Sequence, residues 1–132
     1  HGGGRIGVLL EVNCETDFVA RNEDFKKLVH DLALHIAASN PLYLSRGDVP
    51  AHILVKEKEI YKARAEAEGK TGKIVEKIVE GRVEKFCKES CLLEQAFVKD
   101  QGIVVQELIS QKIASIGENI RVKRFVRYVL GE

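Results

Sequence analysis

Residues 11–25 read EVNCETDFVARNEDF, and the hydrophobic periodicity of the chain changes within this stretch. Up to Cys14, apolar and polar side chains alternate with period two, which is typical of a strand that covers a core with one face. From Phe25 onward, apolar residues recur every three to four positions, which is typical of an amphipathic helix. Between the two lies the corner Thr16-Asp17-Phe18-Val19, where a large aromatic residue follows an acid at a place expected to face water.

The strand predicted for residues 5–14 has one apolar residue on its otherwise polar face. The side chains expected to point to the core are those of Ile6, Val8, Leu10, Val12 and Cys14. The opposite face would carry Arg5, Gly7, Leu9, Glu11 and Asn13. Because Leu9 is apolar, we expect the outer face to be partly covered as well.

A helix is predicted to follow the corner. Asn22 is a favourable N-cap, and Glu23 and Asp24 place negative charge in the first turn. The pair Asn40-Pro41 is expected to end this helix. Its apolar stripe has helical spacing and consists of Phe25, Leu28, Val29, Leu32 and Ile36.

The middle of the chain is predicted to form an antiparallel pair of helices. The first helix would span residues 50–68 and end at Gly69, and the second would begin after Thr71. Before this pair, residues 42–45 fit a short strand and residues 46–48 fit a turn.

The C-terminal part is predicted to contain a helix over residues 104–116, ended by Gly117, and a strand over residues 119–130. Residues 92–99 fit either a loop or an extended segment. Alternation along the last strand groups Ile120, Val122, Val126, Tyr128 and Leu130, with Arg124 as an exception on that face. The other face would carry Arg121, Lys123, Phe125 and Arg127, so we expect Phe125 to point outward like Leu9.

This order of elements predicts an α+β fold in a single domain over residues 1–132. A small antiparallel sheet of about three strands would pack against a layer of helices that includes the antiparallel pair. The chain has 45% hydrophobic residues and no apolar run near the ~20 residues that cross a bilayer, so we expect a soluble protein. The chain has no Met, and we interpret residue 1 as an internal cut or as processed material.

Charge and cysteine content narrow the class of protein further. Lys and Arg number 21 against 20 Asp and Glu, which argues against a strongly basic nucleic-acid binder. Cys14, Cys87 and Cys91 are too few for a disulfide scaffold and suit a reducing cytosol.

The motifs that carry chemistry are absent or lie in the wrong context. The glycines at positions 2, 4 and 7 match a dinucleotide fingerprint but precede a strand rather than a helix, and Gly69-Lys70-Thr71 follows a helix rather than a strand. Cys87 and Cys91 provide half of a zinc site at most and are interpreted as small buried residues. We therefore predict no enzyme, no metal and no cofactor.

Two features keep alternatives open. The basic last strand, with Arg121, Lys123 and Arg127 beside aromatic residues, could bind RNA, although a solvated or partner-facing strand is the favoured interpretation. At the corner, Thr16 or Asp17 could simply cap a helical turn, and Phe18 or Val19 could pack over its start.

Residues 11–22, EVNCETDFVARN, resemble the signature of elongation factor Ts, the nucleotide-exchange partner of elongation factor Tu in translation. The later segments 76–82 (EKIVEGR), 92–100 (LLEQAFVKD) and 117–120 (GENI) also resemble that family, so the resemblance covers the chain. The chain is similar to the core, or dimerisation, domain of this family and resembles its short bacterial form. The family's N-terminal helical module is absent from the resemblance.

The resemblance implies a cytoplasmic protein that binds elongation factor Tu and promotes release of its GDP, so that GTP can bind. It assigns the partner contact near the magnesium site of Tu to Thr16, Asp17, Phe18 and Val19, with Phe18 as a wedge. It also implies that two copies pair through their sheets. No membrane and no direct nucleic-acid contact are expected.

Overall fold

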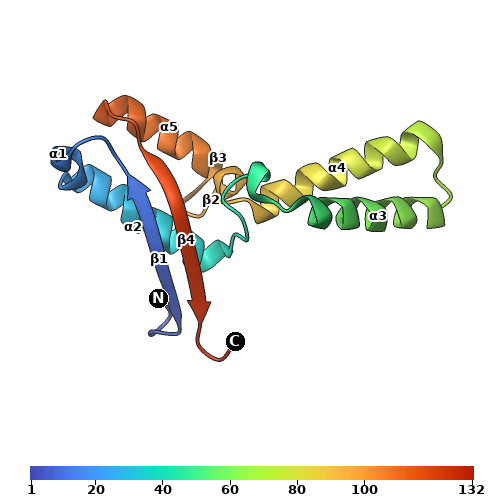
Figure 1. Ribbon diagram of the computed structural model, residues 1–132, viewed down its shortest axis with the longest axis horizontal. Helices are drawn as coiled ribbons and strands as arrows, with labels where there is room; N and C mark the ends of the chain where they lie inside the picture. The colour runs from blue at the N-terminus through green and yellow to red at the C-terminus, as the bar shows by residue number, and fades with distance from the viewer.

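The computed structural model describes residues 1–132 and separates a body from a projecting helical hairpin (Figure 1). The elements in chain order are β1 (Ile6–Asn13), α1 (Asp17–Ala20), α2 (Glu23–Ser39), η1 (Arg46–Asp48), α3 (Ala51–Ala67), α4 (Gly72–Ser90), η2 (Leu92–Glu94), β2 (Ala96–Phe97), β3 (Asp100–Val104), α5 (Val105–Ile116) and β4 (Arg121–Val129). The α+β class is thus confirmed. None of the helices is long and apolar enough to cross a membrane.

The first and last strands form the long antiparallel pair β1–β4. Its register shifts once, because Glu11 pairs with Arg124 whereas the next residue, Val12, pairs with Val122. Lys123 is therefore an extra residue on β4, which makes a β-bulge. A bulge reverses the alternation of side chains between the two faces of the strand beyond it.

This bulge makes the predicted outward orientation of Phe125 wrong. Ile120 and Val122 are buried as expected, but beyond the bulge it is Phe125 that packs against the core. Val126, Tyr128 and Leu130 are exposed instead, on the side of the sheet where Leu9 lies. Leu9 itself points outward, as predicted, with 69% of its surface exposed.

The strands are divided between two small sheets rather than gathered in one sheet of about three. The second sheet is the antiparallel pair β2–β3. The short strand predicted for residues 42–45 does not form, and Tyr43 makes only an isolated bridge to Cys91. The amides of Leu42 and Tyr43 both donate to the carbonyl of Ser90, so this segment crosses the end of α4 instead of joining a sheet.

Helix α2 forms the floor of the main core and lies behind β1 and β4 in Figure 1. Asn22 caps it as predicted, since its side-chain oxygen accepts from the amide of Asp24 at 2.7 Å. The helix ends at Asn40, which adopts the left-handed conformation. The whole predicted stripe lies in the core, which comprises Val19, Phe25, Leu28, Leu32, Ile36, Leu92, Phe97, Val105, Ile109, Ile120 and Val122, with Val29 packed against it.

A fully buried histidine links α2 to the segment before β3. The Nδ1 atom of His35 accepts from the backbone amide of Val98 at 3.1 Å, and because an amide only donates, Nδ1 must be unprotonated. The proton then lies on Nε2, which is 2.8 Å from the side-chain oxygen of Gln95. Burial lowers the pKa of His35, and the hydrogen bond to Gln95 opposes this only in part.

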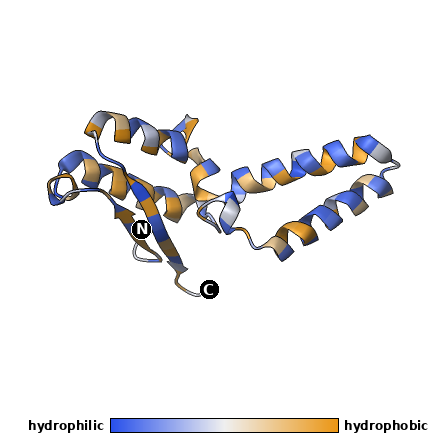
Figure 2. Ribbon diagram, turned by 45° about the horizontal axis from the view of Figure 1, so that its top comes forward, coloured by the Kyte–Doolittle hydropathy of each residue, from blue (hydrophilic) through white to orange (hydrophobic).

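The hairpin consists of α3 and α4, which pack antiparallel as predicted. Gly69 ends the first helix with a φ of 84°, a conformation that favours glycine. Figure 2 shows that much of the hairpin is hydrophilic, with hydrophobic bands at intervals along α4 and a group of them where α3 begins, beside the body. There, a second small core forms around Val49, Cys87 and Cys91, which confirms that these two cysteines are buried.

We predict that the neutral state of His35 makes stability depend on pH. Below the unfolded-state pKa of about 6.5, the unfolded chain binds a proton that the folded chain excludes, so the free energy of unfolding falls as pH falls, by up to ~1.4 kcal/mol per unit. Urea denaturation at pH 7.5, 6.5 and 5.5 measures this slope. The substitution His35→Gln, which cannot be protonated, should flatten it.

The matched control is His30→Gln, on the exposed side of the same helix. It removes a histidine but none of these hydrogen bonds, so the slope should persist. An unchanged slope in His35→Gln would contradict the assignment.

Candidate functional site

The corner between β1 and α2 folds into one helical turn, α1. Its residues differ in whether their side chains face the solvent or the core. Thr16 caps the turn, because its Oγ1 accepts from the amide of Val19 at 3.3 Å. A helix of four residues cannot hold itself in water, so its position depends on contacts with the rest of the chain.

Phe18 lies at the tip of this corner with 87% of its surface exposed. Its neighbour Asp17 is exposed too, in the first turn of α1. An apolar ring left in water is a site where a partner can gain binding energy, since burying a Phe side chain is worth about 2–3 kcal/mol. The structure thus places an aromatic contact and a carboxylate side by side on the surface.

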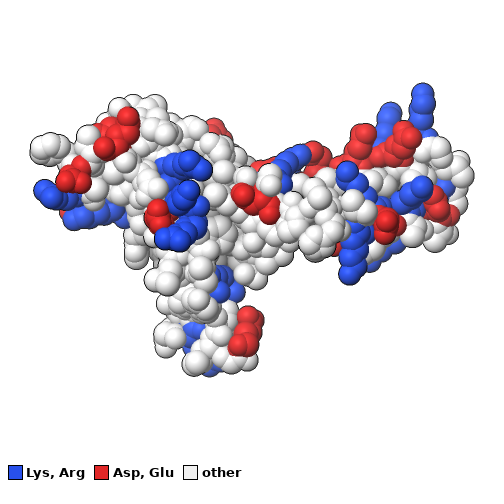
Figure 3. All heavy atoms as spheres, viewed as in Figure 1, with Lys and Arg blue, Asp and Glu red and all other residues white.

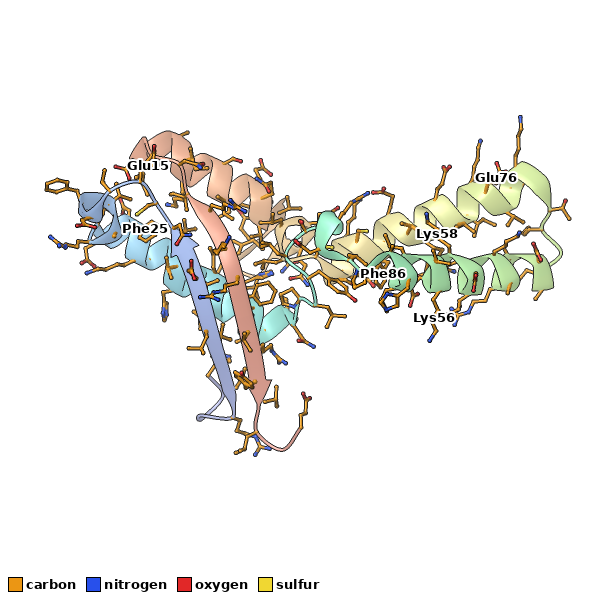
Figure 4. The ribbon with its side chains drawn as sticks, viewed as in Figure 1. Glu15, Phe25, Lys56, Lys58, Glu76 and Phe86 are labelled. Atoms are coloured by element: carbon orange, nitrogen blue, oxygen red, sulfur yellow. The ribbon has the colours of Figure 1, made fainter.

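Val19 points the other way. It is 9% exposed and belongs to the main core together with Phe25 of α2, which Figure 4 shows beside the corner. The structure thus brings Thr16, Asp17 and Phe18 to the surface but turns Val19 inward, where it anchors the turn. The simple capping interpretation is right for Thr16 and Val19, while Phe18 packs over nothing in this chain.

A second anchor comes from the loop between α5 and β4. The carboxylate of Glu118 accepts from the amides of Glu15 and Thr16, at 3.1 and 3.0 Å, and from the hydroxyl of Thr16 at 2.6 Å. In return, the carboxylate of Glu15, labelled in Figure 4, accepts from the amide of Asn119 at 2.7 Å. Sequence reasoning did not connect Glu118 with the corner.

The basic strand β4 keeps only part of the surface that RNA binding would require. Figure 3 shows basic side chains over the upper part of β4, where Arg121, Lys123 and Arg124 are exposed. Arg127, however, donates to the carbonyl of Ala37 at 3.1 and 3.2 Å, and Phe125 packs inward. An aromatic platform interleaved with free cations is therefore not formed.

Two further places bring together groups that could bind a metal or a ligand. Cys87, Cys91 and Glu94 offer ligand atoms within 4.8 Å of one another, but both oxygens of Glu94 accept from Arg46, whose charge repels a cation. Burial raises the pKa of the Cys91 thiol to about 11, which disfavours the thiolate that binds metals. A groove of about 860 Å³ between α3 and α4 is lined by 12 residues, half of which are lysines and glutamates, including Lys58 and Glu76 (Figure 4).

Comparison with known proteins identifies one family. The family model described as "Elongation factor TS" matches residues 1–132. The chain is 64% identical over 132 residues to elongation factor Ts of Syntrophomonas wolfei and covers 62% of that protein. It is 64% identical to that of Moorella thermoacetica, covering 65%, and 63% identical to that of Acetivibrio thermocellus, covering 61%. All of this chain is matched each time, so it spans somewhat less than two thirds of these relatives.

The opposite orientations of Phe18 and Val19 predict opposite effects on stability. Val19→Ala removes two buried methyl groups and should lower the free energy of unfolding by about 1–3 kcal/mol. Phe18→Ala removes an exposed ring and should change it by less than about 0.5 kcal/mol. Chemical denaturation of both variants measures the difference, and a large loss in Phe18→Ala would show that the ring packs inside the folded chain.

Proposed function

The chain belongs to the elongation factor Ts family, and from this we propose that it is a guanine-nucleotide exchange factor that acts on elongation factor Tu. It binds Tu with GDP, weakens the hold on the nucleotide and promotes its release, so that GTP can enter. The observation that carries the proposal to particular residues is Phe18, exposed at the tip of a corner that is anchored on both sides. The chain spans 62% of the Syntrophomonas wolfei relative, so the activity of the whole protein is part of this proposal.

Phe18 acts as a wedge in this proposal. The ring enters an apolar slot of Tu near the site where Mg²⁺ and phosphate are held. Burial of the ring supplies about 2–3 kcal/mol, which offsets the displacement of the groups of Tu that hold the ion. Asp17, next to it, supplies a carboxylate that competes for hydrogen-bond donors of the same region. Thr16 and Val19 contribute by shaping and anchoring the turn.

Exchange by this route is a matter of differential binding. If the chain binds nucleotide-free Tu more tightly than Tu with GDP, then by linkage it weakens GDP binding by the same factor. A difference of 2–3 kcal/mol corresponds to about 30–150-fold. No covalent step takes place, so the protein needs neither a nucleophile nor a metal of its own, and it is not an enzyme in the sense of catalysing a chemical conversion.

We further propose that residues 1–132 form one core domain, which acts in the cytoplasm and pairs with a second copy through the outer face of β1–β4. The residues that support this pairing are Leu9, Val126, Tyr128 and Leu130, all exposed on one side of the sheet. A two-stranded sheet with an apolar outer face favours coverage by a partner. Self-pairing there leaves the corner free for Tu.

Release of a fluorescent GDP analogue from bacterial elongation factor Tu tests the exchange activity. We expect the intact chain to accelerate release, and Phe18→Ala to lose at least about tenfold of that acceleration, because the wedge no longer gains burial energy. The matched control is Ile74→Ala, which removes an exposed apolar side chain from the hairpin and should leave the rate unchanged. Equal rates with and without the chain would refute the exchange function.

Sedimentation velocity tests the pairing of two copies. The substitution Tyr128→Lys places a charge on the outer face of the sheet, where Tyr128 is 63% exposed, and should convert dimers to monomers without loss of secondary structure. The control Tyr61→Lys changes a tyrosine of the hairpin and should leave the mass of the dimer unchanged. A monomer at all concentrations for the unsubstituted chain would contradict this part of the proposal.

A further inference from the structure

The strongest feature outside the exposed ring is the carboxylate that reaches the corner from a segment about a hundred positions away. Glu118 receives three hydrogen bonds from two consecutive residues, Glu15 and Thr16. These are the residues at which the chain leaves β1 and enters α1. Hydrogen bonds to an ionised acceptor are the stronger kind, and three on one carboxylate fix both the position and the direction of the backbone.

Glu118 is itself held in place on both sides. Gly117 before it ends α5 in the left-handed conformation, with its amide bonded to the carbonyl of Ile113 at 2.8 Å. Ile120 beyond it is buried in the main core. Asn119 between them donates its amide to Glu15. The backbone that carries Glu118 is therefore fixed to the body, and the carboxylate reaches the corner from that position.

The hydroxyl of Thr16 connects Glu118 to the first turn of α1. It donates to Glu118 at 2.6 Å while its oxygen accepts from the amide of Val19 at 3.3 Å. The first turn of α1 is therefore started by a group whose own orientation Glu118 sets. Phe18 lies between Thr16 and Val19, so the direction of its ring follows from these two bonds and from the burial of Val19.

We propose that Glu118 is the positioning residue that presents Phe18 to the partner, an inference that rests on the proposed exchange function. It does not touch Tu in this account. It restricts α1 to one orientation before binding, so that less conformational entropy is lost when the ring enters its slot. Without it, the burial of Val19 and the bond between Asn119 and Glu15 remain, but neither orients the Thr16 hydroxyl that starts the turn, and a four-residue helix so held samples several orientations.

A first experiment uses the isolated chain and asks whether Glu118 holds the corner. Amide hydrogen exchange in Glu118→Ala should be about tenfold faster than in the unsubstituted chain at positions 15, 16, 19 and 20, with no change in α2 or β4. Glu118→Gln keeps one oxygen acceptor and should lie between the two. Glu107→Ala, which removes an exposed glutamate from the first turn of α5, is the matched control and should leave the corner unchanged. Equal exchange at the corner in all variants would overturn the proposal.

A second experiment asks whether Glu118 acts through Phe18. In the nucleotide-release assay, Glu118→Ala should reduce the acceleration by about 3–10-fold, with partial rescue in Glu118→Gln. In a chain that already carries Phe18→Ala, the same substitution should have no further effect, because the ring to be positioned is gone. An equal loss in both backgrounds would mean that Glu118 supports the body in general, and would overturn the positioning role.

The two experiments separate this inference from the proposed function. If the intact chain does not accelerate GDP release, the proposed nucleotide-exchange function fails. The positioning role toward Tu then fails with it, whatever the rates of amide hydrogen exchange are. If the intact chain is active and Glu118→Ala is equally active, only the inference fails. Thermal unfolding of each variant confirms that a lost activity does not reflect a lost fold.

Discussion

The antiparallel pairing of β1 with β4 is the contact on which the rest of the structure depends. It joins the two ends of the chain, from Ile6 opposite Val129 to Asn13 opposite Arg121. One face of the pair covers α2 and closes the main core. At its upper end, the pairing brings the exit of β1 next to the entry of β4, so that Glu118 meets Thr16. At its outer face, it leaves a row of apolar side chains exposed.

At the corner, two neighbouring residues have opposite environments: Phe18 faces the solvent and Val19 is buried in the core. An exposed aromatic ring contributes nothing to folding, so the turn that carries it must be held by other groups. Val19 contributes burial and Glu118 contributes hydrogen bonds, one from each side of the turn. This division explains how a ring that adds nothing to folding stays in a defined place on the surface.

The features that sequence reasoning found are those that short-range chemistry determines. Asn22 and Gly117 mark helix ends because caps depend on one residue and its nearest neighbours. The bulge at Lys123 depends on the register of the opposite strand, so period-two counting put Phe125 on the wrong face and Tyr128 in the core.

The role of Glu118 depends on a contact across 102 positions, and the only signal was its place after a helix-ending glycine in a segment that resembles the family. The partner contact assigned to Val19 came with the motif as a whole, and only the structure shows that its side chain turns inward.

The central claim is that the ring of Phe18 moves from water into an apolar slot of elongation factor Tu. Fluorine NMR with 4-fluorophenylalanine at position 18 tests it most directly, because the solvent-isotope shift of the fluorine signal reports exposure to water. We expect a sharp, solvent-sensitive signal in the free chain and a shifted signal without solvent sensitivity in the saturated complex with nucleotide-free Tu. A fluorine signal that stays sharp and solvent-sensitive in the saturated complex would contradict the burial of the Phe18 ring in Tu.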